Sequence, residues 1–406
     1  MKKAVLCVLS ALVILPLCPQ ELRHTTGVTN VEVPVRVFDG DKFIDNLSLT
    51  DFVVQENGVP QKVVAVYLVK KTDVLRKEEQ QTIEPNTHRT FYLFFEIYEY
   101  VPKLHEALDY FIKNVLGPRD DLAVVTSLKT YRLRKDAMAR LTQDRLVEQL
   151  VSLVRKDTVA GNAEYNSVLD DMKGIARRIS GSMATLGPNG IAFSVSSFSE
   201  MSKDAIDEQL DLYRVELQKL ENLRIVDETK LMSFAKYLKN VKGQKNVFVF
   251  YQREFIPILD KKVFNQNMDM LDESTQMNIA DLFNFQKRKP TLNADAVKKA
   301  YADSSIAIHF LYLTPLPDRV EGLQMEEHSE DILAPFLEMS QATGGVAASS
   351  SNPAFAMKKA ADASENYYLL YYAPAEYQAD GKFREIKVSV KGKNYRVSHR
   401  AGYFAN

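Results

Sequence analysis

The pattern of hydrophobic and polar positions changes after residue 89. Thr90 to Tyr100 is a nearly continuous apolar and aromatic run of strand length, and Asp121 to Thr126 is a second. Between these runs, apolar residues recur at i, i+3 and i+4 from Leu104 to Val115, which predicts an amphipathic helix. A strand, a helix and a strand in this order predict a βαβ unit, whose parallel strands are buried on both faces.

The same alternation continues along the chain. Helical spacing of apolar residues covers residues 141–154, 206–220, 231–238 and 332–343, and strand-like apolar runs cover residues 247–251 and 306–313. Strands that alternate with helices predict an α/β fold with a doubly wound, mostly parallel sheet. We assign residues 89–350 to this domain, with helical insertions. Residues 180–204 are rich in Ser and Gly and are expected to form a surface loop, whose role the sequence leaves open.

Both ends of the chain have a different pattern, in which polar and apolar residues alternate with period two. Residues 25–70 predict an N-terminal β unit and residues 365–406 a C-terminal β segment, which together would form a small β module. Residues 71–88 are polar and charged, and they predict a linker.

The first twenty residues have the composition of a signal peptide. Lys2 and Lys3 precede an apolar core that is too short to span a bilayer, so we expect an exported protein, periplasmic or extracellular. The two cysteines of the chain, Cys7 and Cys18, both lie in this segment. Cys18 leaves open a membrane-anchored lipoprotein, although Leu17 stands where a lipidation motif has a small residue.

Composition and the absence of known motifs argue against several classes of function. The net charge of −1 gives no basic surface for nucleic acid. The chain has no phosphate-binding loop, no dinucleotide fingerprint, no nucleophile elbow and no His-Glu-x-x-His zinc motif. We therefore expect no cofactor and no enzymatic activity.

Five segments, in order, resemble the bacterial exported branch of the von Willebrand factor A-like (vWA) family, known as VWFA-related domains. They cover nearly all of the chain after the signal peptide. The segments are Leu49-Thr-Asp-Phe-Val-Val-Gln-Glu-Asn-Gly-Val-Pro-Gln61, Lys242-Gly-Gln-Lys-Asn-Val-Phe-Val-Phe250, Ala342-Thr-Gly-Gly345, Tyr367-Tyr-Leu-Leu-Tyr-Tyr372, and Asp380-Gly-Lys-Phe-Arg-Glu-Ile-Lys-Val388 with Arg400-Ala-Gly-Tyr403. The resemblance implies a vWA-like α/β domain.

The resemblance also implies a metal-ion-dependent adhesion site at the carboxyl ends of the strands. The family holds Mg²⁺ with Asp-x-Ser-x-Ser after the first strand, a Thr from a second loop and an Asp from a third. Here the matching positions are Glu96, Tyr98 and Tyr100, and then Gln252-Arg253-Glu254 after Tyr251. Phenols are poor substitutes for serine hydroxyls around a hard cation, so we predict that the metal site is lost. A residual cation held by Glu96 and Glu254 stays open as an alternative.

These residues define the candidate site. We predict a binding crevice made by the residues at the carboxyl ends of the strands, namely Glu96, Tyr98, Tyr100, Tyr251, Arg253 and Glu254. The leading hypothesis is a non-enzymatic protein that binds an unidentified protein partner through this aromatic rim. The tyrosines could instead fill the crevice under a loop. A scaffold protein of the cell envelope, metal-dependent adhesion and a hydrolase using Glu96 and Glu254 are the competing interpretations.

Overall fold

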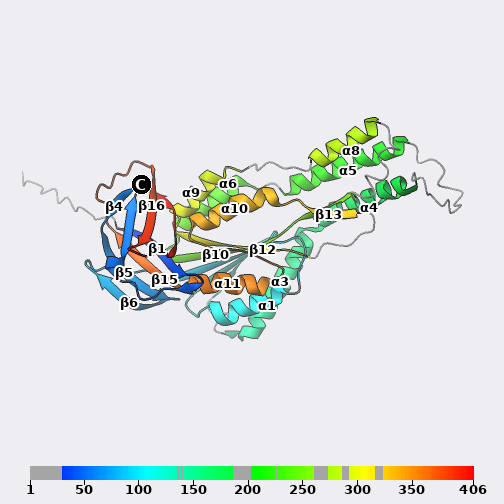
Figure 1. The fold of residues 1–406 in the computed structure, drawn as a ribbon. Helices are drawn as coiled ribbons and strands as arrows, with labels where there is room; N and C mark the ends of the chain where they lie inside the picture. Colours follow the sequence, from blue (N-terminus) through cyan, green and yellow to red (C-terminus); the bar gives the residue numbers. More distant parts are fainter. Residues whose placement is uncertain are drawn as a thin grey trace, which may run out of the picture.

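The computed structural model describes residues 30–134, 138, 140–185, 203–224, 226–259, 273–285, 292–315 and 323–406. Three parts follow one another in space: a β-sandwich, a central sheet with helices on both faces, and a helical arm (Figure 1). The fold is therefore mixed α/β. The expected signal peptide (residues 1–20) and residues 186–202 of the Ser- and Gly-rich segment lie outside the described residues.

The central sheet has the order β14-β12-β10-β7-β8-β9, and all its strand pairs are parallel except β8 with β9. The strands are β7 (Arg89–Glu96), β8 (Asp121–Val125), β9 (Thr130–Leu133), β10 (Gln244–Gln252), β12 (Ile306–Leu313) and β14 (Ala347–Ser350). All eight residues of β12 are buried, which explains its unbroken apolar sequence. The apolar runs at 90–96, 121–125, 247–251 and 306–313 are confirmed as strands.

Helices cover both faces of this sheet. One face packs against α1 (Leu104–Tyr110, continued by a π-helical turn, Phe111–Val115), α3 (Gln143–Gly161) and α11 (Pro353–Glu365). The other face packs against α6 (Glu228–Lys239), α9 (Ala294–Asp303) and α10 (Glu330–Ala342). Side chains of β7 alternate between the two: Phe91, Leu93 and Phe95 face α1, whereas Tyr92 and Phe94 face α6.

The β-sandwich is built from both ends of the chain. One sheet contains β1 (Val31–Asp39), β2 (Lys42–Phe43), β5 (Val63–Lys70), β6 (Asp73–Glu79), β15 (Asn366–Tyr372) and β17 (Arg396–His399). The other contains β3 (Phe52–Glu56), which follows a 3₁₀ turn (Leu49–Asp51), β4 (Val59–Gln61), β16 (Phe383–Val390) and β18 (Gly402–Phe404). A single hydrophobic core joins the two sheets. It lies at the amino ends of the central strands (Figure 1).

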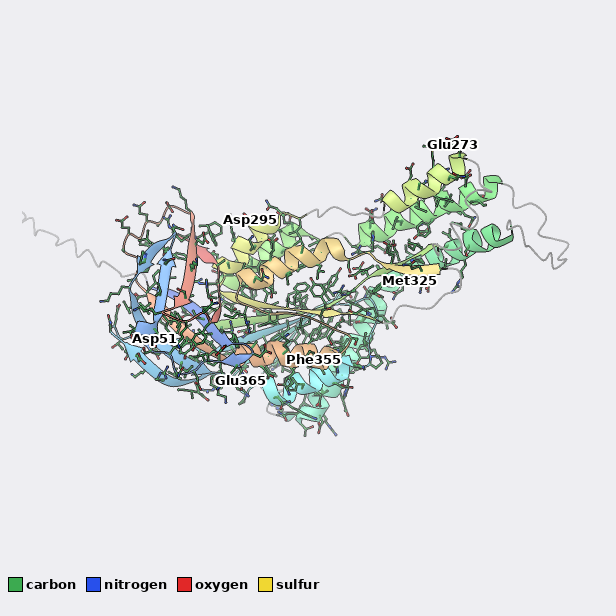
Figure 2. The ribbon with its side chains drawn as sticks, viewed as in Figure 1. Asp51, Glu273, Asp295, Met325, Phe355 and Glu365 are labelled. Carbon is green, nitrogen blue, oxygen red and sulfur yellow. The ribbon has the colours of Figure 1, made fainter. Side chains whose placement is uncertain are left out.

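The arm, which carries Glu273 and Met325 (Figure 2), projects from the opposite end of the molecule (Figure 1). It consists of α4 (Ala163–Thr185), α5 (Lys203–Leu223), α8 (Glu273–Phe285) and an antiparallel pair, β11 (Phe255–Leu259) with β13 (Leu323–Glu327). These elements share a hydrophobic core of their own. They leave the body after α3, after β10 and after β12, so three separate chain segments build the arm.

Three expectations need correction. A mostly parallel sheet holds only for the central sheet, because the other three sheets formed by the described residues are antiparallel. The expected linker at 71–88 contains β6, whose charged and largely exposed side chains are typical of a protected edge strand. The surface loop expected over residues 180–204 starts later than predicted: α4 continues to Thr185, because burial of Ile175 and Ile179 outweighs the cost of the glycine that follows Ser180.

Candidate functional site

The predicted site residues lie where the arm meets the carboxyl ends of the central strands. Glu96 is the last residue of β7 and pairs in register with Tyr251 of β10. In open α/β sheets, this edge is where ligands bind. Here the arm rises from the same edge (Figure 1), so the predicted crevice lies at the base of the arm.

Tyr98 fastens the loop after β7 to both the sheet and the arm. The backbone N–H groups of Tyr98 and Glu99 donate to Gln252 Oε1 at 3.1 and 3.0 Å, and the Tyr98 hydroxyl donates to the Arg253 carbonyl at 3.2 Å. The Tyr98 ring packs on Tyr165 of α4, with 5.1 Å between the centroids. Tyr98 is therefore a structural contact between the body and the arm.

Tyr251, Arg253 and Glu254 are also used inside the molecule. The Tyr251 hydroxyl donates to Glu254 at 2.9 Å, and Arg224 of the arm forms an ion pair with the same carboxylate. Arg253 Nη1 donates to both carboxylate oxygens of Glu327 at 2.8 Å. Tyr251 is only 7% exposed. These side chains consequently do not form the exposed aromatic patch that the sequence suggested.

Tyr100 lies apart from the other predicted residues. Its half-buried ring packs against the core on the α1 side of the sheet, and the Arg155 guanidinium lies 5.8 Å from the ring centroid. Burial raises the pKa of the Tyr100 hydroxyl above its usual range. The structure therefore does not bring Tyr100 together with Glu96.

A cavity of about 730 Å³ lies beneath α6 and α10, on the sheet face opposite α1. Apolar and aromatic side chains of β7, β8, β10 and β12 form its floor. Four of the six predicted site residues line it, namely Glu96, Tyr98, Tyr251 and Glu254, whereas Tyr100 and Arg253 do not. Its volume lies within the range of small-molecule sites in proteins.

Glu96 differs from its neighbours because its carboxylate is not engaged. The side chain follows Tyr92 and Phe94 on the same face of β7 and lines the cavity. Water can reach the carboxylate within the cavity, while the surrounding protein displaces bulk solvent and raises the pKa of Glu96. Within the described part of the chain, this carboxylate has no hydrogen-bond or ion-pair partner.

The residues at this edge do not fit the divalent-cation site that the family resemblance implies. Glu254 is already paired with Arg224, whose positive charge opposes a cation. Glu96 is then the one carboxylate of the predicted set left free to bind. Over the described ranges, no three His, Cys, Asp or Glu side chains group closely enough to hold a metal ion.

Sequence reasoning missed several residues of this site. Arg224, Tyr165 and Glu164 line the cavity together with Glu96, and Asn162 Nδ2 donates to the Ile97 carbonyl at 2.9 Å. They come from the arm and from its junction with α3, far from Glu96 in sequence. The sequence signal was weak: Arg224 directly follows the apolar stripe of α5, which by itself indicates only the end of a helix.

No protein-family model matches the chain, and no curated protein matches it. Among solved structures, the chain is similar to the human COPII-coat protein Sec24c, with a TM-score of 0.31 and 9% sequence identity. The alignment covers 79% of this chain and 44% of that one, so this chain spans less than half of the Sec24c chain.

No helix in the described ranges is both long enough and apolar enough to cross a bilayer.

Proposed function

We propose that this chain is a non-enzymatic, exported, vWA-like protein that binds another protein through its helical arm. The observation that carries the proposal is the arm itself, which stands on the edge of the sheet where open α/β folds bind their ligands (Figure 1). In this proposal a recognition surface on the arm takes the place of a metal-dependent crevice.

The vWA-like assignment is supported by the way the resembling segments come together. Within Ala342-Thr-Gly-Gly345, the Ala342 carbonyl accepts a hydrogen bond from the Ala401 N–H at 2.7 Å, and Thr343 forms an antiparallel β-bridge with Arg400. In the sandwich, the hydroxyls of Tyr372 and Tyr403 donate to Glu56 Oε2 at 2.7 and 3.0 Å. Segments that match the family in sequence therefore form direct contacts, as expected if they belong to one structural unit.

The outer surface of the arm supports protein binding. Leu212 and Val215 are neighbours on one face of α5 and are 41% and 51% exposed. The acidic side chains of Glu208 and Asp211 lie beside them in a shallow hollow. In total, α5 carries six acidic and three basic residues. A partner that fits this face has an apolar side chain flanked by Lys or Arg.

A site-specific cross-link tests the proposal. A photoreactive residue replaces Val215 on the arm, and the matched control replaces Val59, which is 56% exposed on β4 of the sandwich. We expect a discrete cross-linked species from the arm and none from the sandwich, in cells that produce the protein. Glu208→Lys should reduce the arm cross-link, whereas the exposed Glu148→Lys on α3 should leave it unchanged.

The other outcomes of this experiment either refute the proposal or favour one of the competing functions. No species at Val215, or a species insensitive to Glu208→Lys, refutes binding through this face. Equal cross-linking at Val59 favours a scaffold with extended contacts. A species that needs a divalent cation and disappears in Glu96→Ala favours metal-dependent adhesion.

A further inference from the structure

The cavity beneath α6 and α10 has an apolar body. Phe94 of β7 and Val249 of β10 lie on central strands, on a face covered by helices, yet both remain only half-buried because they border the cavity. Phe234 and Phe336 contribute from the helices above. Apolar surface left accessible between two packed layers is costly unless something apolar fills it.

One end of the cavity is polar and acidic. Glu96 and Glu164 line it at the carboxyl edge of the sheet, and neither carboxylate has a hydrogen-bond or ion-pair partner among the described residues. The other two acidic residues of the lining are already paired, Glu254 with Arg224 and Asp227 with Lys230. This end therefore has an excess of negative charge.

The remaining basic residue of the lining lies at a distance. Arg132 of β9 pairs in register with Ala123, which pairs with Tyr92, four residues before Glu96. At about 3.3 Å per residue, that places Arg132 roughly 13 Å from Glu96 along the strand direction. Arg132 also donates to the Tyr237 hydroxyl at 2.9 Å. It does not neutralise the acidic end.

Aromatic rings complete the acidic end. Tyr98 and Tyr165 line the cavity beside Glu96 and Glu164 and pack on each other. Tyrosine faces attract cations through the ring quadrupole, and an adjacent carboxylate adds direct charge attraction. Carboxylates combined with tyrosine rings are suited to an organic ammonium group.

We propose that this cavity is a binding site for an amphiphilic organic cation, with its ammonium group between Glu96, Glu164, Tyr98 and Tyr165 and its apolar body on Phe94 and Val249. An anionic amphiphile would place its charge against two carboxylates. A neutral one would leave both carboxylates without a counter-ion. The site is separate from the arm surface, so neither proposal depends on the other.

Calorimetric titration of the purified protein with n-octylamine, octanoate and n-octanol tests the charge preference on a common apolar chain. We expect octylammonium to bind roughly 10- to 100-fold more tightly than either of the others, the range that a charge-assisted hydrogen bond supplies. Tighter or equal binding of octanoate, or no binding by any of the three, overturns the proposal.

Three variants locate the site. Glu96→Gln should reduce the affinity for octylammonium, with Glu164 keeping part of its preference over octanol, while the matched change Glu99→Gln, outside the lining, should leave the affinity unchanged. Val249→Phe fills the apolar body and should abolish binding of every probe. An unchanged affinity for octylammonium in folded Glu96→Gln refutes the role of this carboxylate. If that variant does not fold, retained binding in Val249→Phe refutes the site.

Discussion

His309 provides the sharpest test of how this core is built. The side chain lies on β12, is 0% exposed and stacks on Phe248 with 4.6 Å between the ring centroids. Neither ring nitrogen has a hydrogen-bond partner within the described residues. Burial lowers the pKa of His309 to about 3, and the positive charge of Arg36 adds to the effect. The imidazole is therefore neutral in the folded protein at every pH above that value.

The magnitude follows from the difference between the folded and unfolded states. An unfolded histidine has a pKa of about 6.5, so below that pH the unfolded chain binds a proton that the folded chain does not. The folded state therefore loses stability as the pH falls from about 6.5 toward 3. Between pH 7.5 and pH 5.0 the loss from this one group is about 2 kcal/mol.

The perturbation is His309→Phe, which keeps a flat ring against Phe248 and removes the titrating group. We expect the free energy of unfolding to fall by about 2 kcal/mol less between pH 7.5 and 5.0 in the variant than in the native chain. Urea unfolding followed by far-UV circular dichroism measures both. Carboxylates and His399 remain in both proteins, so their contributions cancel in the difference. An identical pH dependence in the two proteins would refute a buried neutral His309.

Three further predictions concern other contacts. Asp120→Ala should destabilise the protein by about 3–5 kcal/mol, because the buried Arg89 guanidinium loses the carboxylate that accepts its Nε hydrogen bond at 3.1 Å. The double variant Arg89→Met/Asp120→Leu should recover most of the lost free energy of unfolding in the same urea assay. Gly345→Ala should cost at least about 1–3 kcal/mol, seen as a lower melting temperature, because the added Cβ would overlap the Ile308 carbonyl; an unchanged melting temperature would contradict that close approach. Titration with Mg²⁺, Mn²⁺ or Ca²⁺ should give no binding heat, and heat that vanishes in Glu96→Ala would restore the metal-dependent interpretation.

The layers of the central domain could be predicted because period and burial are coupled. A strand buried on both faces has to be apolar throughout, so residues 306–313 indicated β12 directly. An amphipathic helix buries the apolar stripe on one of its faces, so the spacing over residues 141–154 indicated α3. Thr142 caps this helix, because its side chain accepts a hydrogen bond from the Arg145 N–H at 3.4 Å.

The arm could not be predicted, because an apolar helical stripe does not say what it packs against. The stripe of α5 from Ile206 to Leu220 is equally consistent with a helix lying on the sheet. Its actual neighbours are α4, from the same segment of the chain, and β11 and α8, from the segment that follows β10. The surroundings of the candidate site depend on that packing. Glu96, Tyr251 and Glu254 lie at the carboxyl edge of the central sheet, as the strand pattern predicted, but the arm covers this edge, with Tyr165 packed on Tyr98 and Glu327 bound to Arg253.

The pairing of the two ends of the chain in one sandwich has a consequence for the order of folding. Strand β1 is held by β15 and β17, and the contact between the Arg400 side chain and the Glu32 carbonyl joins residues 368 positions apart. Contacts this distant in sequence slow folding, because a long loop has to close before any pairing is gained. On a ribosome, β1 emerges long before β15 and β17, and apart from its short pairing with β2 both of its edges stay unpaired until those strands are made. In that interval it is open to pairing with other chains, so newly made protein depends on protection from aggregation more than the finished fold does.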